Sequence, residues 1–287
     1  MEGIVKGKRI DFGGIFLYLF LTGLGIVMLL PLVYMVSTAF KPVSELFLFP
    51  PRFFVDNPTL INFRDLLLVT GTTSVPFSRY IFNSLFVSLC IVFFGTIISA
   101  MAAYPLAKHN MRFGSAIFNL IVLALMFSPL VIQIPQYLIV SKLGLINTYW
   151  ALILPFLAAP VGMFLMTQFL RQLPDALLEA ARIDGANEWR IFWTVVMPML
   201  KPAISTFALL SFITAWNDPH PAQVYTTDND MKTLPFAIQS LSGGVGVIAR
   251  VGTLGAASLL MIIPIIIIFI ITQRMVLQTM AHSGLKE

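Results

Sequence analysis

The sequence predicts an all-α integral membrane protein with six transmembrane helices. Hydrophobic residues make up 58% of the 287 residues and charged residues only 11%, well below the roughly 25% charged of a soluble domain. Five long stretches contain no Asp, Glu, Lys or Arg, and each exceeds the roughly 20 residues that a helix needs to cross the hydrocarbon core. These stretches are 12–40, 80–107, 113–141, 143–170 and 251–273.

Taken in order, the expected spans cover residues 14–40, 80–107, 115–138, 149–170, 200–220 and 252–273. The fifth is the shortest, because its uncharged stretch, 202–217, has only 16 residues. Lys201 and Asp218 must therefore extend toward opposite interfaces. The chain thus divides into a tail, residues 1–13, and a six-span domain, residues 14–287.

Basic residues predict that both termini are cytoplasmic. With the amino terminus inside, the inner segments hold eleven Lys and Arg residues and the outer segments hold seven. The positive-inside rule favours this orientation. The tail 1–13 and the loop 171–198 are then cytoplasmic, and the loops 41–79 and 218–250 are external. The net charge of +5 reflects topology, since no clustered basic face for nucleic acid is visible.

Two features of the sequence restrict the chemistry. A cleaved signal peptide is an alternative for the first span, but 29 uncharged residues far exceed the 7–15 of a signal h-region, so a retained anchor is favoured. Cys90 is the only cysteine, and His109, His220 and His282 are scattered. We therefore expect no internal disulfide and no metal site, and no cofactor bound by this chain.

Four prolines interrupt spans three and four. Pro129, Pro135, Pro155 and Pro160 remove backbone donors and kink helices. A membrane tolerates this where neighbouring helices or a cavity satisfy the freed groups. Two interpretations stay open: the prolines shape a pathway, or they reflect only the higher frequency of proline in membrane helices.

The segment between spans four and five is the most informative part of the chain. Pro174 and Asp175 suit the first turn of a helix. Leu177, Ala180, Ala181 and Asp184 follow at i, i+3, i+4 and i+7, which predicts one shallow, mostly apolar face. Gly185 suits the left-handed backbone after a helix. A second helix is expected from Glu188 to about Met197, with Asn187 as its cap and Pro198 at its end. In the first helix, Glu179 and Arg182 are spaced so that their side chains can form an ion pair. From these residues alone, a docking surface and an amphipathic linker on the membrane are equally compatible.

A resemblance decides between these two interpretations. Glu179-Ala180-Ala181, Gly185 six residues after Glu179, and Val195, Met197 and Pro198 resemble the EAA loop of permease subunits in binding-protein-dependent ABC importers. The family more often has Ile and Leu where this chain has Val195 and Met197. Residues 178–193, 215–218 and 141–150 look like the carbohydrate-uptake branch, and the six-span topology is similar to the smaller permease subunit of maltose-type transporters. The resemblance covers residues 83–274.

The resemblance implies a fold, a mechanism and partners. The fold is that of a type I ABC importer permease, with cytoplasmic coupling helices between spans four and five. Glu179, Ala180, Ala181, Asp184, Gly185 and Pro198 would couple to an ATPase. The chain lacks a Gly-x4-Gly-Lys-Ser/Thr phosphate loop, so it is expected to be a transport subunit and not an enzyme, with ATP and Mg on partner ATPase subunits. Further expected partners are a second permease subunit forming a heterodimer, two ATPase copies and an extracytoplasmic solute-binding protein, all at a bacterial inner membrane.

The substrate is expected to be a sugar or oligosaccharide, on the resemblance alone. Gln133, Gln136, Tyr137, Trp216 and Asn217 have suitable chemistry for the pathway, although Trp and Tyr also form interfacial belts. The glycine run 243–246 in the outer loop is a candidate contact for the binding protein, and a solvated flexible loop is the alternative. After Asp218 the chain departs from the family with Pro219-His220-Pro221.

An ion-coupled secondary transporter is the alternative function. Such proteins usually place ionisable residues within the bundle and often show repeated halves. Here the span interiors are nearly free of charge and no repeat is visible. A polytopic membrane enzyme would need clustered His, Asp or Glu, and Asp218, His220 and Asp228 are too loosely spaced for that.

Overall fold

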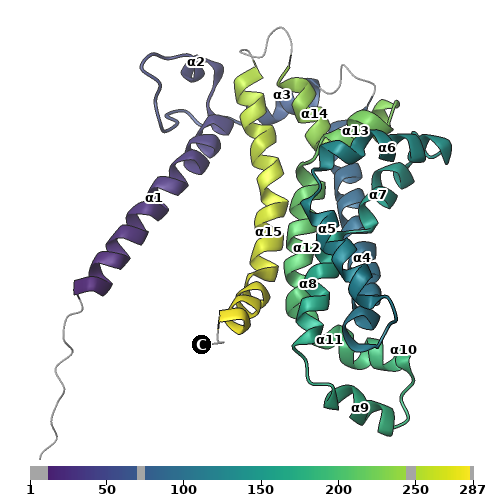
Figure 1. Cartoon of the computed structure of the whole chain (residues 1–287). Helices are drawn as coiled ribbons and strands as arrows, with labels where there is room; N and C mark the ends of the chain where they lie inside the picture. Colours follow the sequence, from purple (N-terminus) through teal and green to yellow (C-terminus); the bar gives the residue numbers. More distant parts are fainter. Residues whose placement is uncertain (1–11, 70–74, 244–249, 285–287) are drawn as a thin grey trace, which may run out of the picture. The chain divides into compact units, whose positions relative to one another are not determined.

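The computed structural model describes residues 12–69, 75–243 and 250–284, and every regular element in these ranges is helical (Figure 1). The chain divides into two compact units. The first comprises Met1–Leu66 with Gly246–Leu259, and the second comprises Leu67–Val245 with Leu260–Glu287. Residues 1–11 of the expected tail lie outside the described residues.

The first unit is built around a long apolar helix and the loop that follows it. Its elements are α1 (Phe12–Phe40), α2 (Val43–Leu46), most of α3 (Ile61–Val69) and the start of α15 (Val251–Gly284). The buried carboxylate of Glu45 accepts the backbone N–H groups of Asp56 and Asn57, at 3.0 and 2.9 Å. The amide of Asn62 donates to two carbonyls at the end of α1, at 2.9 and 2.7 Å. The described part of the loop 41–79 is therefore held by buried polar side chains.

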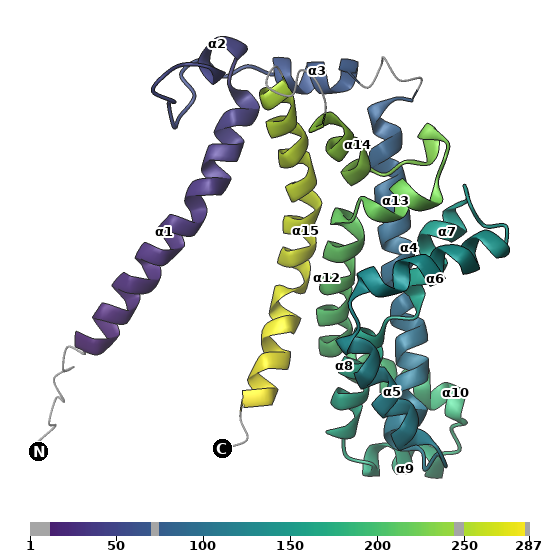
Figure 2. The same cartoon turned by 45° about the horizontal axis from the view of Figure 1, so that its top comes forward.

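The second unit contains the end of α3, the part of α15 from Leu260 onward and all the remaining helices. They are α4 (Phe77–Lys108), α5 (Gly114–Met126), α6 (Pro129–Lys142), α7 (Tyr149–Leu157), α8 (Pro160–Arg171), α9 (Ala176–Ile183), α10 (Glu188–Ile191), the π-helical turn η2 (Phe192–Val196), α11 (Met197–Met199), α12 (Lys201–Asn217), α13 (His220–Tyr225), the 3₁₀ turn η3 (Asn229–Met231) and α14 (Leu234–Leu241). The 32-residue α4 packs against α7, α8 and α12. Figures 1 and 2 show α4, α8 and α12 side by side, with α9 and α10 at one end and α13 and α14 toward the other.

Small residues bring α4, α8 and α12 together. A Cβ atom on Gly162 of α8 would lie 2.6 Å from the Ser99 hydroxyl of α4 and 2.8 Å from the Phe207 ring of α12. Gly95 lies under the same ring, where a Cβ would be 3.5 Å away. Ala100 and Ala103 of α4 are fully buried in the adjoining core. The lipid supplies no hydrophobic drive for helix association, so close approach over small residues provides the packing energy.

Within the described residues, four helical segments are long and apolar enough to cross a membrane, and two bent pairs bring the number to as many as six. The four are Phe16–Phe40, Phe77–Lys108, Tyr149–Arg171 and Val251–Met275. The bent pairs are Gly114–Met126 with Pro129–Lys142 and Glu188–Met199 with Lys201–Asn217. These segments agree with the six expected spans in order, and they differ at the third.

The third span is broken instead of kinked. The chain turns by 108° between α5 and α6. Ser128, at ψ 134°, caps α6 with its hydroxyl, and Pro129 begins that helix. The same arrangement recurs in span four, where Ala159 has ψ 102° and Pro160 begins α8. A proline disfavours the α conformation in the residue before it, so both breaks precede a proline.

The described part of the outer loop 218–250 is folded. Asn83 of α4 is fully buried, and its amide donates to the carbonyls of Asp230 and Lys232 at 2.7 and 2.8 Å. Its carbonyl oxygen accepts a hydrogen bond from the Tyr149 hydroxyl at 2.7 Å. Lys232 is 7% exposed and donates to two further backbone carbonyls, and burial lowers the pKa of its ammonium group. A loop held this way is ordered, whereas glycine-run residues 244–246 lie outside the described residues.

The helix crossing at Gly162 yields a stability prediction. Gly162→Ala should lower the free energy of unfolding by about 1–3 kcal/mol, because the Phe207 ring must shift in a packed interior. Thermal unfolding of the purified protein, followed by size-exclusion chromatography, measures the change. Gly25→Ala in α1 is the control, since its Cβ would meet nothing within 4 Å. Equal stability of the two variants would contradict the close packing described here.

Candidate functional site

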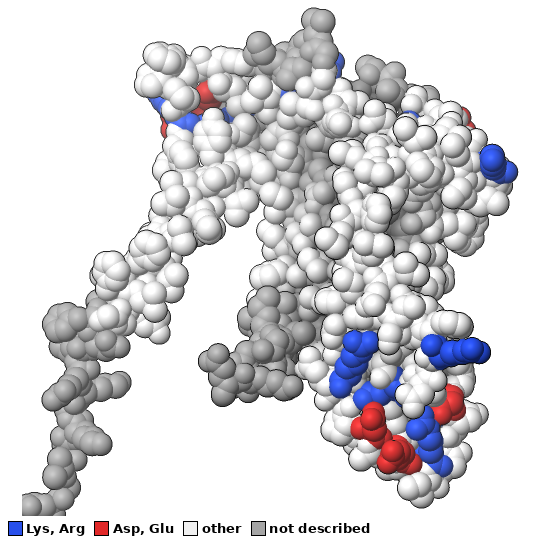
Figure 3. All heavy atoms as spheres, in the orientation of Figure 1, with Lys and Arg blue, Asp and Glu red and all other residues white. Residues whose placement is uncertain are grey.

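The segment 173–200, called here the α9–α10 segment, forms one end of the second unit. It holds α9, α10, η2 and α11, and it follows α8 directly and leads into α12 (Figures 1 and 2). Figure 3 shows that acidic and basic side chains gather on this end, while the surface along the neighbouring helices is almost free of charge. The segment is therefore a polar cap on an apolar bundle.

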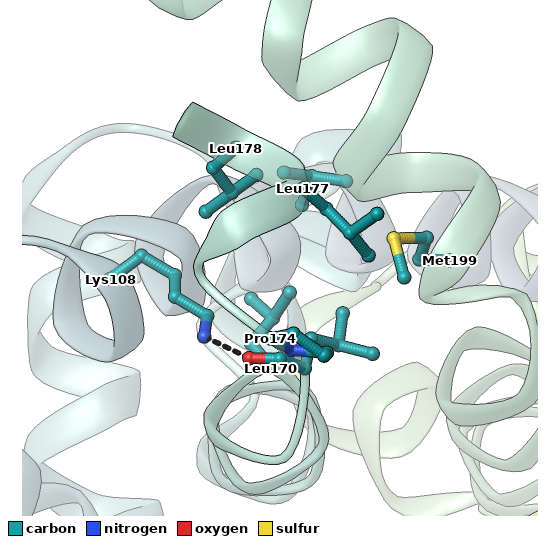
Figure 4. Close-up of a pocket in the computed structure, with 8 residues that line it drawn as sticks. Lys108, Leu170, Pro174, Leu177, Leu178 and Met199 are labelled. Carbon is teal, nitrogen blue, oxygen red and sulfur yellow. Dashed lines mark hydrogen bonds between the residues drawn. The ribbon is translucent and has the colours of Figure 1, made fainter. Parts of the chain in front are cut away.

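Lys108 joins this segment to the end of α4. Its side chain is only 5% exposed, and its ammonium group donates to the Leu173 carbonyl at 2.5 Å (Figure 4). The same ammonium group donates to the Asp175 carboxylate at 2.6 Å. The aliphatic part of the lysine lies beside Leu170, Pro174 and Leu178 in a small apolar pocket. One buried cation thus fixes the turn between α8 and α9 against α4.

Glu188 makes a second connection to α4. Its carboxylate accepts hydrogen bonds from the Tyr104 hydroxyl at 2.7 Å and from Arg182 at 2.9 Å, and the His109 ring nitrogen lies 3.5 Å away. The Tyr104 hydrogen bond, followed by that from Arg182, holds the pKa of Glu188 below its ordinary value. The expected pair Glu179–Arg182 is not formed, because Arg182 is bound to Glu188 from the opposite side of the turn.

The turn between α9 and α10 has the geometry expected from its sequence. Gly185 has φ +79°, a left-handed backbone that glycine adopts without steric cost. The Asn187 side chain accepts the Arg190 backbone N–H at 2.8 Å and caps α10, as predicted. The helical backbone continues through the π turn and past Pro198 to Met199, and α12 begins at Lys201 after a bend of 73°. Pro198 itself is exposed and is the second residue of α11, so it does not end the helix.

The outward face of α9 is rotated relative to the face expected from the sequence. Leu178 is 6% exposed and Ala181 is half-buried, and both pack on the core below. Glu179, Ala180 and Asp184 are exposed, and Ile183 is 86% exposed. Ala181 therefore contributes to the attachment of α9 and much less to its outer surface.

Glu179 and Asp184 are available to another molecule. Neither carboxylate makes a hydrogen bond or ion pair with the described part of the chain, in contrast to Glu188. The exposed Ile183 lies beside them in the sequence. The surface formed by Glu179, Ala180, Ile183 and Asp184, called here the outer α9 face, combines an apolar side chain with free negative charge.

A cavity of about 540 Å³ lies within the second unit, in the roughly 300–1,000 Å³ range of ligand pockets. Its walls come from α4, α6, α7, α8, α12 and α13. Pro129, Pro155 and Pro160 line it, which favours the interpretation that the prolines shape a pathway. Most of the lining is apolar, and its polar members are Gln133, Gln136, Ser211, Thr214, Asp218, His220, Tyr225 and Thr233.

Of the five residues expected in the pathway, two line this cavity. Gln133 and Gln136 line the cavity, and Gln136 accepts a hydrogen bond from the Tyr225 hydroxyl at 3.1 Å. Tyr137 stacks on Tyr225 outside the lining. Trp216 is 0% exposed, stacks on a neighbouring ring and donates to the Met261 carbonyl at 2.9 Å, so it is a packing residue. Asn217 is exposed, does not line the cavity and donates back to its own helix.

Comparison with known proteins identifies the family. Residues 95–282 match the family described as "Binding-protein-dependent transport system inner membrane component". The chain belongs to this family. It is a transmembrane permease subunit and not an enzyme, and it works in a transporter that depends on a solute-binding protein. This membership decides against the ion-coupled secondary transporter.

Individual relatives agree with the family assignment. The permease is 31% identical over 256 residues to the arabinooligosaccharides transport system permease protein AraQ of Halalkalibacterium halodurans, covering 89% of this chain and 90% of that one. It is 30% identical to the sulfoquinovosyl glycerol transport system permease protein SmoH of Agrobacterium fabrum, covering 90% and 89%. A crystal structure of a bacterial ABC transporter that imports the acidic polysaccharide alginate matches with a TM-score of 0.79 over 93% of this chain and 98% of that chain, at 23% identity. The permease therefore has the type I ABC importer fold.

Three residues of the α9–α10 segment and its attachment went unrecognised in the sequence. Tyr104 and Lys108 lie at the end of span two, 84 and 67 positions before their partners Glu188 and Asp175, and no local pattern links them to the segment. Ile183 carries a signal that could have been used, since an isoleucine beside Asp184 and Gly185 at a helix end has no core to enter. Its side chain is 86% exposed in the structure.

The two carboxylates Glu179 and Glu188 predict opposite outcomes of substitution. Glu188→Ala should loosen the α9–α10 segment and raise the rate of tryptic cleavage at Arg182 in membrane vesicles by at least about threefold, since local opening governs cleavage. Glu179→Ala is the matched control and should leave the rate unchanged, because Glu179 has no partner within the described residues.

This prediction has a pH dependence. The folded-state pKa of Glu188 is lowered, so its contribution is fully present above the ordinary value of 4.5 and is lost as the pH falls through the folded pKa. The cleavage rates of the wild type and of Glu188→Ala should therefore differ near neutral pH and become more similar at strongly acidic pH. A protease that is active at both pH values measures this. Equal cleavage of Glu188→Ala and Glu179→Ala would show that the hydrogen bonds of Glu188 to Tyr104 and Arg182 do not hold the α9–α10 segment in place.

Proposed function

We propose that this permease forms half of the translocation pathway of an ATP-driven carbohydrate importer in a bacterial inner membrane. A solute-binding protein delivers a sugar or oligosaccharide from outside, and a second permease subunit completes the pathway as a heterodimer. Two copies of an ATPase subunit hold ATP and Mg on the cytoplasmic side. The observation that carries the proposal is the outer α9 face, an EAA-loop surface with unpaired carboxylates and an exposed isoleucine, in a member of a binding-protein-dependent transport family.

The charge distribution supports a cytoplasmic position for the α9–α10 segment. Because four of the six proposed spans precede this segment and two follow it, both termini are proposed to lie on the same side. Within residues 75–243, six Lys and Arg residues lie at this end of the bundle: Lys108, Arg112, Arg171, Arg182, Arg190 and Lys201. Three lie at the other end: Arg79, Lys142 and Lys232. The positive-inside rule favours the cytoplasm for the more basic end.

The two connections to α4 support a mechanism for coupling. Lys108 and the Tyr104–Glu188 hydrogen bond attach the α9–α10 segment to α4, and Val87 and Ile91 of α4 line the cavity. Movement of the segment by a closing ATPase dimer therefore moves a wall of the cavity. Alternating access then follows from two packed arrangements whose populations depend on the nucleotide.

A carbohydrate substrate is supported by the relatives and by the cavity. The relative from Halalkalibacterium halodurans transports arabinooligosaccharides by its name. The cavity offers amide and hydroxyl groups on an apolar wall that includes Phe156 and Phe207. Sugars present hydroxyl groups and apolar ring faces, which match such a wall.

Charge reversal on the outer α9 face tests the coupling. Glu179→Lys should abolish ATP-dependent uptake and release the ATPase on mild-detergent purification, while membrane insertion stays normal, because Glu179 makes no contact within the described part of its own chain. Asp230→Lys is the control: Asp230 is also exposed, and its carbonyl accepts a hydrogen bond from Asn83 near the start of α4, whereas the α9–α10 segment is attached to the end of α4. This variant should leave the ATPase bound. ATPase retention by Glu179→Lys would sink the docking proposal.

Co-purification tests the assembly itself. A tagged permease extracted in mild detergent should bring down a second multi-span subunit and a phosphate-loop ATPase at two copies per permease pair. Mass spectrometry of the intact complex gives the ratio. Recovery of the permease alone, or as a homo-oligomer, under conditions that preserve known complexes would contradict the proposed assembly.

A further inference from the structure

We infer that the cavity of about 540 Å³ selects an uncharged saccharide and disfavours anionic ones. The inference rests on the proposed function and names the substrate class of the same site. It is carried by the charges that line the cavity. None of the lining residues is a lysine or arginine, and one of them, Asp218, is a carboxylate.

Asp218 contributes a negative charge that nothing in the described chain neutralises. Its Oδ1 atom accepts the His220 backbone N–H at 2.9 Å, and its Oδ2 atom makes no hydrogen bond or ion pair with the described residues. The first lysine after Asp218 along the chain is Lys232, which is 7% exposed. Its ammonium group donates hydrogen bonds to two backbone carbonyls. Lys232 does not line the cavity.

Uncharged polar groups in the lining remain available to a ligand. The Thr233 hydroxyl is buried, with the residue 7% exposed, and it has no hydrogen-bond partner in the described structure. Gln133 and Ser211 also line the cavity, and their side chains make no hydrogen bond to the described residues. A buried hydroxyl without a partner costs free energy, and a substrate hydroxyl entering the cavity would satisfy it.

These groups favour hydroxyls over carboxylates, sulfonates or phosphates. Hydroxyls can donate to the free Asp218 oxygen and exchange hydrogen bonds with Thr233, Ser211 and Gln133. An anion normally needs guanidinium or ammonium groups for recognition, and here it would approach a carboxylate in a largely apolar wall. Similarity to a transporter of the acidic polysaccharide alginate therefore extends to the fold and not to the charge of the cargo.

The sign of the cavity potential can be measured without knowing the sugar. Thr214 lines the cavity one helical turn before Asp218, so its side chain lies within about 6 Å of that residue's Cβ atom. Thr214→Cys is placed in a Cys90→Ala background, since Cys90 is the only native cysteine. The complete transporter is then treated with a cationic thiosulfonate, MTSET, and an anionic one, MTSES, so that any charge from the partner permease is included.

The inference predicts a preference for the cationic reagent. Relative to a small free thiol, the rate ratio of MTSET to MTSES at the introduced thiol should be raised by about tenfold or more, and Asp218→Asn should return it close to the free-thiol value. His220→Gln should leave the ratio raised. A ratio at or below that of the free thiol, or one that Asp218→Asn does not change, overturns the inference.

Cargo identity provides the second measurement. Liposomes containing the complete transporter and its binding protein are given a hydrolysate of neutral arabinan and one of pectate, and mass spectrometry identifies the internalised oligosaccharides. Neutral species should be enriched at least about tenfold over uronate-bearing ones. Uptake mainly of uronates overturns the inference while the proposed function stands. Absence of ATP-dependent uptake of either class counts against both, whereas the thiol ratio still reports the cavity charge separately.

Discussion

The second unit depends on the close approach of α8 and α12 to α4. Gly162 and Gly95 leave room for the Phe207 ring, and the Ser99 hydroxyl fills the remaining space. In a bilayer, apolar side chains gain nothing by leaving lipid for protein, so contact distance and packing decide which helices associate. Because this crossing fixes the three helices, it also fixes one wall of the cavity, since Phe207 lines it. A small residue on α8 therefore affects both the packing of the helices and the position of a cavity wall.

Polar side chains then attach segments to the two ends of α4. At one end, Asn83 binds the backbone of the outer loop and the Tyr149 hydroxyl. At the other, Tyr104 and Lys108 bind the α9–α10 segment. Directional hydrogen bonds at both ends of one helix allow a displacement at either end to reach the other without melting the apolar middle. This is the arrangement that an alternating-access protein needs, with rigid bodies joined at few points.

Each of the six expected spans is helical over most of its length in the structure. An uncharged run of 20 or more residues has few alternatives to a membrane helix. The sequence could not predict that span three breaks by 108° at Ser128. A proline within a span is compatible with a mild kink or a full break, and the choice depends on which groups satisfy the freed backbone. The local sequence also predicted the turn between α9 and α10. There the left-handed backbone follows from Gly185 and the helix cap from Asn187.

Two features were harder to predict: which side of a helix is exposed, and which residues contact helices far away in the sequence. Helical periodicity placed Ala180 and Ala181 on one face, but the orientation of α9 is set by Leu178 entering the core of other helices, which the local sequence does not encode. Trp216 was expected in the pathway for its chemistry, yet the ring is occupied by packing and by a hydrogen bond to the Met261 carbonyl. A large aromatic residue near the end of a span can either pack against another helix or contact a substrate, and which of these it does depends on the neighbouring helix.

The shortness of α12 explains why a carboxylate can belong to the cavity. Its 17 residues extend about 26 Å, less than the roughly 30 Å of a hydrocarbon core. If Lys201 reaches the cytoplasmic interface, Asp218 ends the helix below the opposite one. A charge at that depth is stable only where it faces water or protein polar groups, and the cavity provides both through its open volume and the His220 backbone N–H. The segment Pro219-His220-Pro221, which departs from the family pattern, follows directly and begins α13. His220 and Pro221 both line the cavity. The short helix and the turn after it therefore act together: the length of α12 sets where Asp218 lies along the bundle, and the His220 backbone N–H holds its Oδ1 atom at the cavity.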